Sequence, residues 1–126
     1  LADRVTLPGV TRDIAAEYRA ADVFVLPSRY EALGLVTTEA MSYGLPVVGF
    51  ADCPGTNELI VDGRSGYLVV PGEDRAESLA HALARLFADP TLRQRMGDAG
   101  ARAVARMASL ASVGDRWANL LARVVR

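Results

Sequence analysis

Two glutamates that flank a glycine are the residues of this chain best suited to chemistry. Glu31 and Glu39 lie eight positions apart, and Gly34 stands between them at the start of an expected helix over Leu35–Tyr43. Carboxylate oxygens accept charge-assisted hydrogen bonds, which suits the hydroxyl groups of a sugar. The N-terminus of a helix offers free backbone N–H groups and the positive end of the helix dipole, which suits a phosphate. Both groups on one loop-helix unit predict a nucleotide-sugar site.

Four short apolar runs predict the strands that would hold this unit. They are Val5–Leu7, Val23–Leu26, Val47–Phe50 and Tyr67–Val70. The middle two are continuously apolar, as in strands covered on both faces. Helices expected over Ile14–Ala20 and Leu35–Tyr43, and a helical turn near Asn57–Val61, separate the strands. This alternation predicts an α/β fold with a Rossmann-like parallel sheet, flanking helices and right-handed connections.

The expected sheet also predicts where a ligand would bind. In an open α/β sheet, ligands bind beyond the carboxyl ends of the strands. Three loops leave such ends, namely Pro8–Asp13, Pro27–Gly34 and Ala51–Asn57. The glutamate-glycine unit occupies the second of these loops, so its position agrees with its chemistry.

From about Asp74 onward the chain has the pattern of successive helices. Asp74 with Glu77 three residues later is typical of a capping box, and Asp89-Pro90 predicts the end of one helix and the start of the next. A middle helix carries a weaker apolar stripe that Gly97 and Gly100 interrupt.

The last expected helix, about Ser112–Arg126, places apolar residues on one face. They are Val113, Trp117, Leu120, Leu121 and Val124. Three helices after the last strand are more than four strands need. We therefore expect residues 1–126 to form a nucleotide-sugar-binding domain whose closing segment, residues 111–126, packs on a further domain.

Composition excludes several other classes of protein. The formal charge is −1, with acids and bases interspersed, which gives no nucleic-acid surface. All 14 basic residues are arginine, so the chain has no lysine for a P-loop or a pyridoxal Schiff base. The single cysteine, Cys53, cannot form an internal disulfide, and no apolar run approaches membrane-spanning length. We expect a cytoplasmic protein and, since no His, Cys, Asp and Glu cluster has ligand spacing, no metal or other cofactor.

An ordered set of motifs extends from about Leu7 to Val70. The motifs are Pro8-Gly9-Val10, Ala21-Asp22-Val23-Phe24-Val25-Leu26-Pro27-Ser28, Glu31-x-x-Gly34-Leu35-x-x-x-Glu39-Ala40-Met41, Gly44-x-Pro46-Val47-Val48, Glu58-Leu59-Ile60-x-Asp62-Gly63 and Gly66-Tyr67-Leu68-Val69. In this set the chain resembles the C-terminal, donor-binding half of a retaining GT-B glycosyltransferase. The family is the large group that includes glycogen and sucrose synthases (glycosyltransferase group 1, or family 4).

The resemblance implies roles for individual residues. Glu31 would contact hydroxyls of the donor sugar and stabilise positive charge at the anomeric carbon, which makes it the catalytic candidate. Glu39 would bind the ribose hydroxyls of the nucleotide. Backbone N–H groups around Leu33, Gly34 and Leu35 would point at the sugar and the diphosphate. The backbone near Val10 would meet the edge of the base, and transfer would retain the anomeric configuration without a metal ion.

The resemblance also implies parts that this sequence does not contain. The family's catalytic domain begins with another Rossmann-like half that holds the acceptor, and the C-terminal half itself begins with a strand, a helix and a strand. We therefore expect a donor-binding half truncated at its N-terminus and inactive by itself. Its partners would be a nucleotide-sugar donor, the missing N-terminal acceptor domain, and a lipid, glycan or small-molecule acceptor. Any contact with the inner face of the membrane would come through that missing domain.

Other interpretations of the same residues stay open at this point. Glu39 could be a solvated helix acid, and Glu31 could merely favour the positive end of the following helix by about 0.3–1 kcal/mol. A non-catalytic nucleotide-binding or interaction module could use the same scaffold. A phosphorylase relative would need the pyridoxal lysine that is absent, and epimerase relatives have a different pattern over Glu31–Val48.

Overall fold

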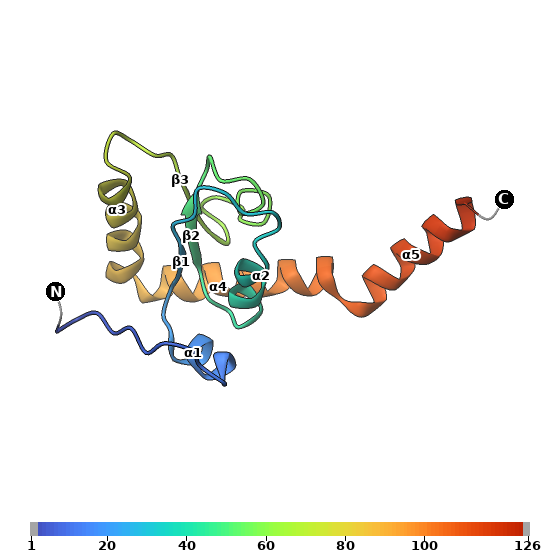
Figure 1. The fold of residues 1–126 in the computed structure, drawn as a ribbon, viewed down its shortest axis with the longest axis horizontal. Helices are drawn as coiled ribbons and strands as arrows, with labels where there is room; N and C mark the ends of the chain where they lie inside the picture. The colour runs from blue at the N-terminus through green and yellow to red at the C-terminus, as the bar shows by residue number, and fades with distance from the viewer. Residues whose placement is uncertain (1–2, 125–126) are drawn as a thin grey trace.

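The computed structural model describes residues 3–124, and its centre is a parallel sheet of three strands. The strands are β1 (Phe24–Leu26), β2 (Val47–Phe50) and β3 (Gly66–Val69), in the spatial order β1-β2-β3 (Figure 1). All four residues of the central strand β2 are buried, as its continuous apolar run predicts. The α/β fold with a parallel sheet is therefore confirmed.

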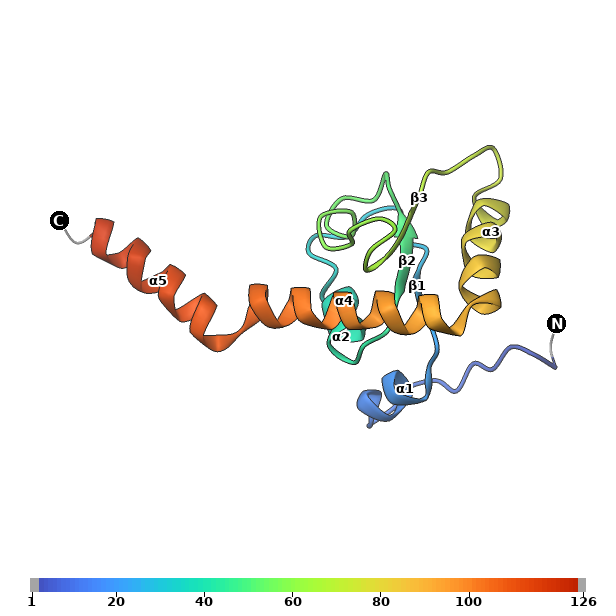
Figure 2. The same ribbon diagram turned by 180° about the vertical axis from the view of Figure 1, so that it is seen from behind.

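The described residues contain five helices. They are α1 (Ile14–Ala20), α2 (Leu35–Ser42), α3 (Arg75–Ala88), α4 (Pro90–Ala108) and α5 (Leu110–Val124). Asp13, Asp74 and Asp89 cap α1, α3 and α4, because each carboxylate accepts a hydrogen bond from a backbone N–H of the first turn. α4 crosses behind the strands in Figure 1 and in front of them in Figure 2.

The core consists of two apolar clusters on opposite faces of the sheet. Successive strand residues point to opposite faces, so neighbouring Val47 and Val48 belong to different clusters. The first cluster joins Val47 to residues of α1 and α2, including Met41. The second joins Val48 to residues of α3 and α4, including Leu86 and Met96. Helices therefore cover both faces of the sheet, and the ends of the strands remain open to loops.

Two glycines of α4 allow it to cross close to α2. A β-carbon at Gly97 would lie 1.8 Å from the carbonyl oxygen of Gly44, and one at Gly100 would lie 3.5 Å from side-chain atoms of Met41. Gly97 and Gly100, which interrupt the apolar stripe of α4, therefore lie where this helix contacts Gly44 and Met41. Only a residue without a side chain permits this approach at Gly97.

The strand predicted over Val5–Leu7 is wrong. These residues have no regular structure, and the side chain of Leu7 is 91% exposed. A strand needs a neighbouring strand to satisfy its backbone groups and a covered face to bury its side chains. In the described part of the chain, neither is available to this short run.

Two smaller segments compare with their expectations as follows. The helical turn expected near Asn57–Val61 is present as a run of turns, in which the N–H of Ile60 donates to the carbonyl of Thr56 at 3.3 Å. The last helix begins at Leu110, two residues earlier than predicted, and residues 125–126 lie outside the described range.

α5 continues away from the body of the molecule in both views (Figures 1 and 2). No residue of this helix is buried, and Trp117 is 60% exposed. Within residues 3–124, no helix combines the length and apolar character that crossing a bilayer requires.

Candidate functional site

The candidate site lies where the loops leave the carboxyl ends of the three strands. Residues 27–34 follow β1, residues 51–57 follow β2, and residues 70–74 lead from β3 into α3. Because the strands are parallel, these ends meet at one edge of the sheet, which is where open α/β sheets bind ligands. The loop after β1 carries Glu31 to this edge.

Glu31 is held through both its side chain and its backbone. The hydroxyl of Ser28 donates to Oε1 of Glu31 at 2.7 Å, and the N–H of Glu31 donates to the carbonyl of Pro54 at 3.3 Å. The residue is partly buried between these contacts. Its carboxylate is therefore restrained by its own loop, while its backbone is tied to the loop after β2.

Gly34 begins α2 in a left-handed conformation, with φ 55° and ψ 45°. A side chain there would be strained by the positive φ, and its β-carbon would lie 3.4 Å from the carbonyl oxygen of Gly55. No side chain caps the start of α2, and its first turn contains no acidic residue. The start of α2 at Leu35 therefore has neither a side-chain cap nor a neighbouring acid in its first turn.

A buried hydroxyl lies beneath this helix start. Oγ1 of Thr37 is the buried side-chain oxygen or nitrogen without a hydrogen-bond partner among the described residues, and the residue is fully buried. The same atom would lie 3.4 Å from a β-carbon at Gly34. An unpaired buried polar group is costly and is uncommon in folded proteins, so its presence marks the start of α2 as unusual.

Glu39 lies in α2, one turn after Leu35, and is exposed, but its carboxylate has a hydrogen-bond donor within the chain. The hydroxyl of Tyr18 donates to Oε2 of Glu39 at 3.0 Å. The ring of Tyr18 is buried and stacked on Tyr43, with ring centres 5.3 Å apart. Burial of the phenol, and next its hydrogen bond to Glu39, raise the pKa of Tyr18. The hydroxyl therefore stays protonated and keeps donating to the carboxylate.

The remaining residues predicted for the site differ in where they lie. Leu33 and Leu35 flank Gly34 with exposed side chains, so the contact they offer at the edge is through the backbone. Val10 is 99% exposed. The segment before α1 runs beside that helix and away from the loops after β1 and β3 (Figure 1). The structure brings Glu31, Leu33, Gly34 and Leu35 to one edge and does not bring Val10 there.

Several supporting residues were not identified from the sequence. Ser28 is three positions from Glu31, so local spacing could have suggested it. Tyr18 is 21 positions from Glu39, and the pair Arg75 and Asp52 is 23 positions apart, so only the fold reveals these contacts.

Metal-ligating side chains do not gather at this edge. Among the described residues, no three His, Cys, Asp or Glu side chains lie together in a way that could hold a metal ion. The chemistry that the site offers comes from two carboxylates, backbone N–H groups and neighbouring hydroxyls.

Residues 1–103 match the family model described as "Glycosyl transferases group 1". A curated relative, the alpha-D-kanosaminyltransferase of Streptomyces kanamyceticus, is 40% identical over 122 residues, which are 95% of this chain and 31% of the relative. The chain therefore spans about a third of the length of that relative.

The solved structures that this chain matches also come from larger chains, of which it covers only a part. Sucrose-phosphate synthase from Thermosynechococcus elongatus matches with a TM-score of 0.87 and 34% identity, over 99% of this chain and 31% of the other. HepE from Anabaena, solved in complex with UDP-glucose, matches with a TM-score of 0.83 and 27% identity, over 98% and 33%. The C-terminal domain of the group 1 glycosyl transferase LpcC from Francisella tularensis matches with a TM-score of 0.69 and 30% identity, over 84% and 53%.

Proposed function

The chain belongs to the group 1 glycosyltransferase family and has the fold of the C-terminal half of a GT-B enzyme, and from this we propose that it binds a nucleotide-sugar donor. The observation that carries the proposal is the start of α2. Gly34 opens this helix without a side-chain cap, and carboxylates lie on both sides of it, at Glu31 and Glu39. The N–H groups would bind the diphosphate, and the carboxylates would bind hydroxyls of the sugar and the ribose. The UDP-glucose in the HepE structure is a ligand of this class.

Glu31 would act at the reacting carbon. In glycosyl transfer the bond to the leaving diphosphate breaks and positive charge develops on the anomeric carbon of the sugar. A carboxylate held near that carbon stabilises the charge, while N–H groups and the helix dipole stabilise the leaving group. The hydrogen bond from Ser28 restrains the carboxylate for this role. Retention of the anomeric configuration, without a metal ion, is part of the proposal and rests on the family resemblance.

Glu39 would bind the ribose. Its carboxylate is restrained by Tyr18 and has oxygen lone pairs left to accept from two neighbouring hydroxyls. Backbone around Val10 would meet the base once that segment lies at the same edge.

The whole enzyme would transfer the sugar to an acceptor hydroxyl on a lipid, a glycan or a small molecule. The acceptor would be held by a separate N-terminal domain, and the apolar face of α5 would pack against that domain. The exposed Trp117 and Leu120 give α5 the composition of such a contact. The single cysteine fits a reducing, cytoplasmic location.

Titration with UDP, GDP and ADP, followed by NMR of the backbone amides, tests the proposal. We expect saturable shifts at Gly34, Leu35 and Glu39 with one diphosphate, weakened at least about tenfold in Glu39→Ala because charged hydrogen bonds contribute about 1.5–3 kcal/mol each. Asp98→Ala, which removes an exposed acid from α4, serves as the control and should bind as the wild type does. A folded chain whose amides respond to none of the three diphosphates would contradict the proposal.

A further inference from the structure

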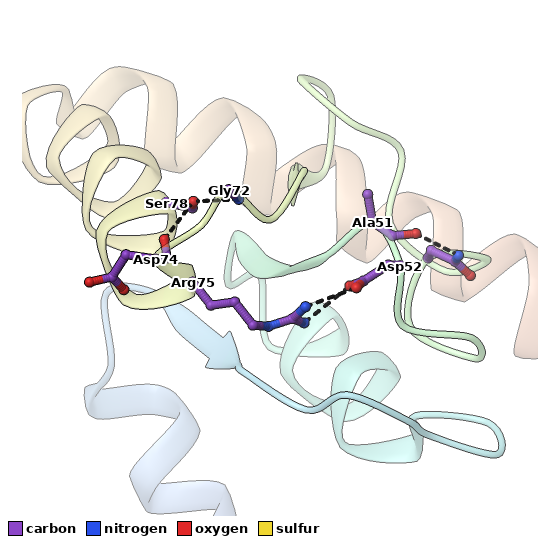
Figure 3. Close-up of polar contacts among 7 residues, drawn as sticks. Ala51, Asp52, Gly72, Asp74, Arg75 and Ser78 are labelled. Atoms are coloured by element: carbon purple, nitrogen blue, oxygen red, sulfur yellow. Dashed lines mark hydrogen bonds and ion pairs between the residues drawn. The ribbon is translucent and has the colours of Figure 1, made fainter.

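An ion pair links the loop after β2 to the start of α3. The guanidinium of Arg75 donates to both carboxylate oxygens of Asp52, at 2.8 and 3.1 Å, from separate nitrogens. Figure 3 shows Arg75 reaching from the first turn of α3 across to Asp52. Paired hydrogen bonds of this kind fix the orientation of both groups as well as their distance.

Aromatic stacking restrains the same arginine. The guanidinium lies 3.7 Å from the centre of the ring of Phe50, the last residue of β2, which is itself buried. The start of α3 is also secured, because the hydroxyl of Ser78 accepts from the N–H of Gly72 and donates to the carbonyl of Asp74 (Figure 3). The side chain of Arg75 is therefore restrained and can in turn restrain the loop that carries Asp52.

Helix stability does not explain an arginine at this position. A cation in the first turn opposes the positive end of the helix dipole, where acidic residues are favoured. The hydrogen bond from Arg75 is the main reason that the pKa of Asp52 is lowered, and Arg29 adds a smaller attraction. Asp52 is thus ionised at neutral pH, and Arg75 has a partner on the adjacent loop rather than in its own helix.

The loop that Asp52 begins is in backbone contact with Glu31. Asn57 donates to the carbonyl of Ala51 at 2.8 Å and so closes the loop on itself. The carbonyl of Pro54 accepts from the N–H of Glu31, and a β-carbon at Gly55 would lie 2.3 Å from the carbonyl oxygen of Glu31. Movement of residues 51–57 would therefore move the backbone of Glu31.

We propose that Arg75 is a positioning residue for the donor site, which anchors Asp52 and through residues 51–57 fixes the backbone that carries Glu31. The effect on donor binding rests on the proposed function, whereas the mechanical link to Glu31 does not. Arg75 itself does not touch the donor in this account.

The test compares Arg75→Gln, Asp52→Asn and the double variant. Arg85→Gln is the matched control, because Arg85 belongs to the same helix and lies over an aromatic ring, that of Tyr67, at 4.5 Å. The first readout is hydrogen exchange of the Glu31 amide in the chain without ligand. We expect exchange to be faster by about tenfold in all three variants of the pair and unchanged in the control, since local opening can change without global unfolding.

The second readout is the dissociation constant for UDP, GDP and ADP. We expect each single variant to bind the preferred diphosphate about three- to tenfold more weakly, and the double variant no more weakly than either, because the two residues act as one unit. Arg75→Lys keeps the charge but not the paired, stacked geometry, so we expect an intermediate loss.

Three results would overturn the inference. They are unchanged exchange of Glu31 in folded variants, additive losses in the double variant, and weaker binding in Arg75→Gln alone, which would mean that Arg75 touches the donor directly. Faster Glu31 exchange in a chain that binds no diphosphate would uphold the mechanical link and count against the proposed function.

Discussion

In the centre of the molecule, β2 and the inward faces of α2, α3 and α4 bury apolar side chains, whereas the apolar side chains of α5 and of residues 3–10 are exposed to solvent. Leu86 in α3 is fully buried, and Leu120 in α5 is half exposed. Both belong to helices with a well-formed apolar face, so amphipathic pattern alone does not distinguish them. The centre is therefore a closed core, while the apolar side chains of α5 and of residues 3–10 are not covered by other described residues.

Truncation of matched leucines is expected to give the largest contrast between the two regions. Leu86→Ala should lower the free energy of unfolding by about 2–5 kcal/mol, because it leaves a cavity in the core. Leu120→Ala should lower it by less than about 1 kcal/mol, since that side chain is already half in water. Denaturant unfolding of both variants measures the difference, and equal losses would mean that α5 is packed in solution.

Replacing a glycine by alanine should lower the stability in the centre and raise it in α5. Gly97→Ala should destabilise by about 1–3 kcal/mol, because its β-carbon would meet the Gly44 carbonyl and force α4 away from α2. Gly114→Ala should stabilise by about 0.5–1 kcal/mol, because nothing lies within 4 Å of its β-carbon and alanine favours the helix. Thermal unfolding of the pair checks the prediction, and a stabilised Gly97→Ala variant would contradict the close crossing.

Tyr18→Phe tests whether the centre also restrains the candidate site. We expect a loss of about 1–2 kcal/mol in stability and weaker diphosphate binding, because the hydrogen bond to Glu39 disappears while the ring remains. Tyr30→Phe is the control, since Tyr30 is largely exposed.

Alkaline pH provides a second measurement of the Tyr18 contact. The pKa of Tyr18 is raised in the folded chain, mainly by burial and then by Glu39, so its stabilising effect is complete below its ordinary value of 10.0 and is lost as the pH rises through the higher folded value. Wild type should therefore lose more stability above pH 10 than Tyr18→Phe does. Parallel pH profiles for the two proteins would show that the phenol does not titrate as described.

Removal of residues 110–126 should have the smallest effect on the core. α5 contributes no buried residue, so the unfolding free energy should change by less than about 1 kcal/mol, in the range of ordinary surface changes. A shortened chain that unfolds much more easily would place α5 within the cooperative core.

Local sequence pattern predicted the parts of the fold that depend on local rules. Short apolar runs located the three strands, and Asp74 and Asp89 marked the starts of α3 and α4. Val5–Leu7 was misassigned because a strand depends on a neighbour that pattern cannot supply. Gly97 appeared as a defect because its partner, Gly44, lies 53 positions earlier in the chain.

The candidate site divides in the same way. Glu31, Gly34 and Glu39 could be chosen from residue type and spacing, because the carboxylates and the helix start are properties of one segment. The long-range contacts could not be chosen in this way, because Tyr18 meets Glu39, and Arg75 meets Asp52, only after the chain has folded.

The most direct test of the central claim compares each nucleoside with its 5′-diphosphate. If the start of α2 binds the diphosphate, the amide signals of Leu35 and Val36 should move with UDP, GDP or ADP and stay in place with uridine, guanosine and adenosine. Glu39 should respond to the preferred nucleoside as well, because it would bind the ribose. Amides of α2 that ignore the diphosphate, in a chain that binds it elsewhere, would contradict the account.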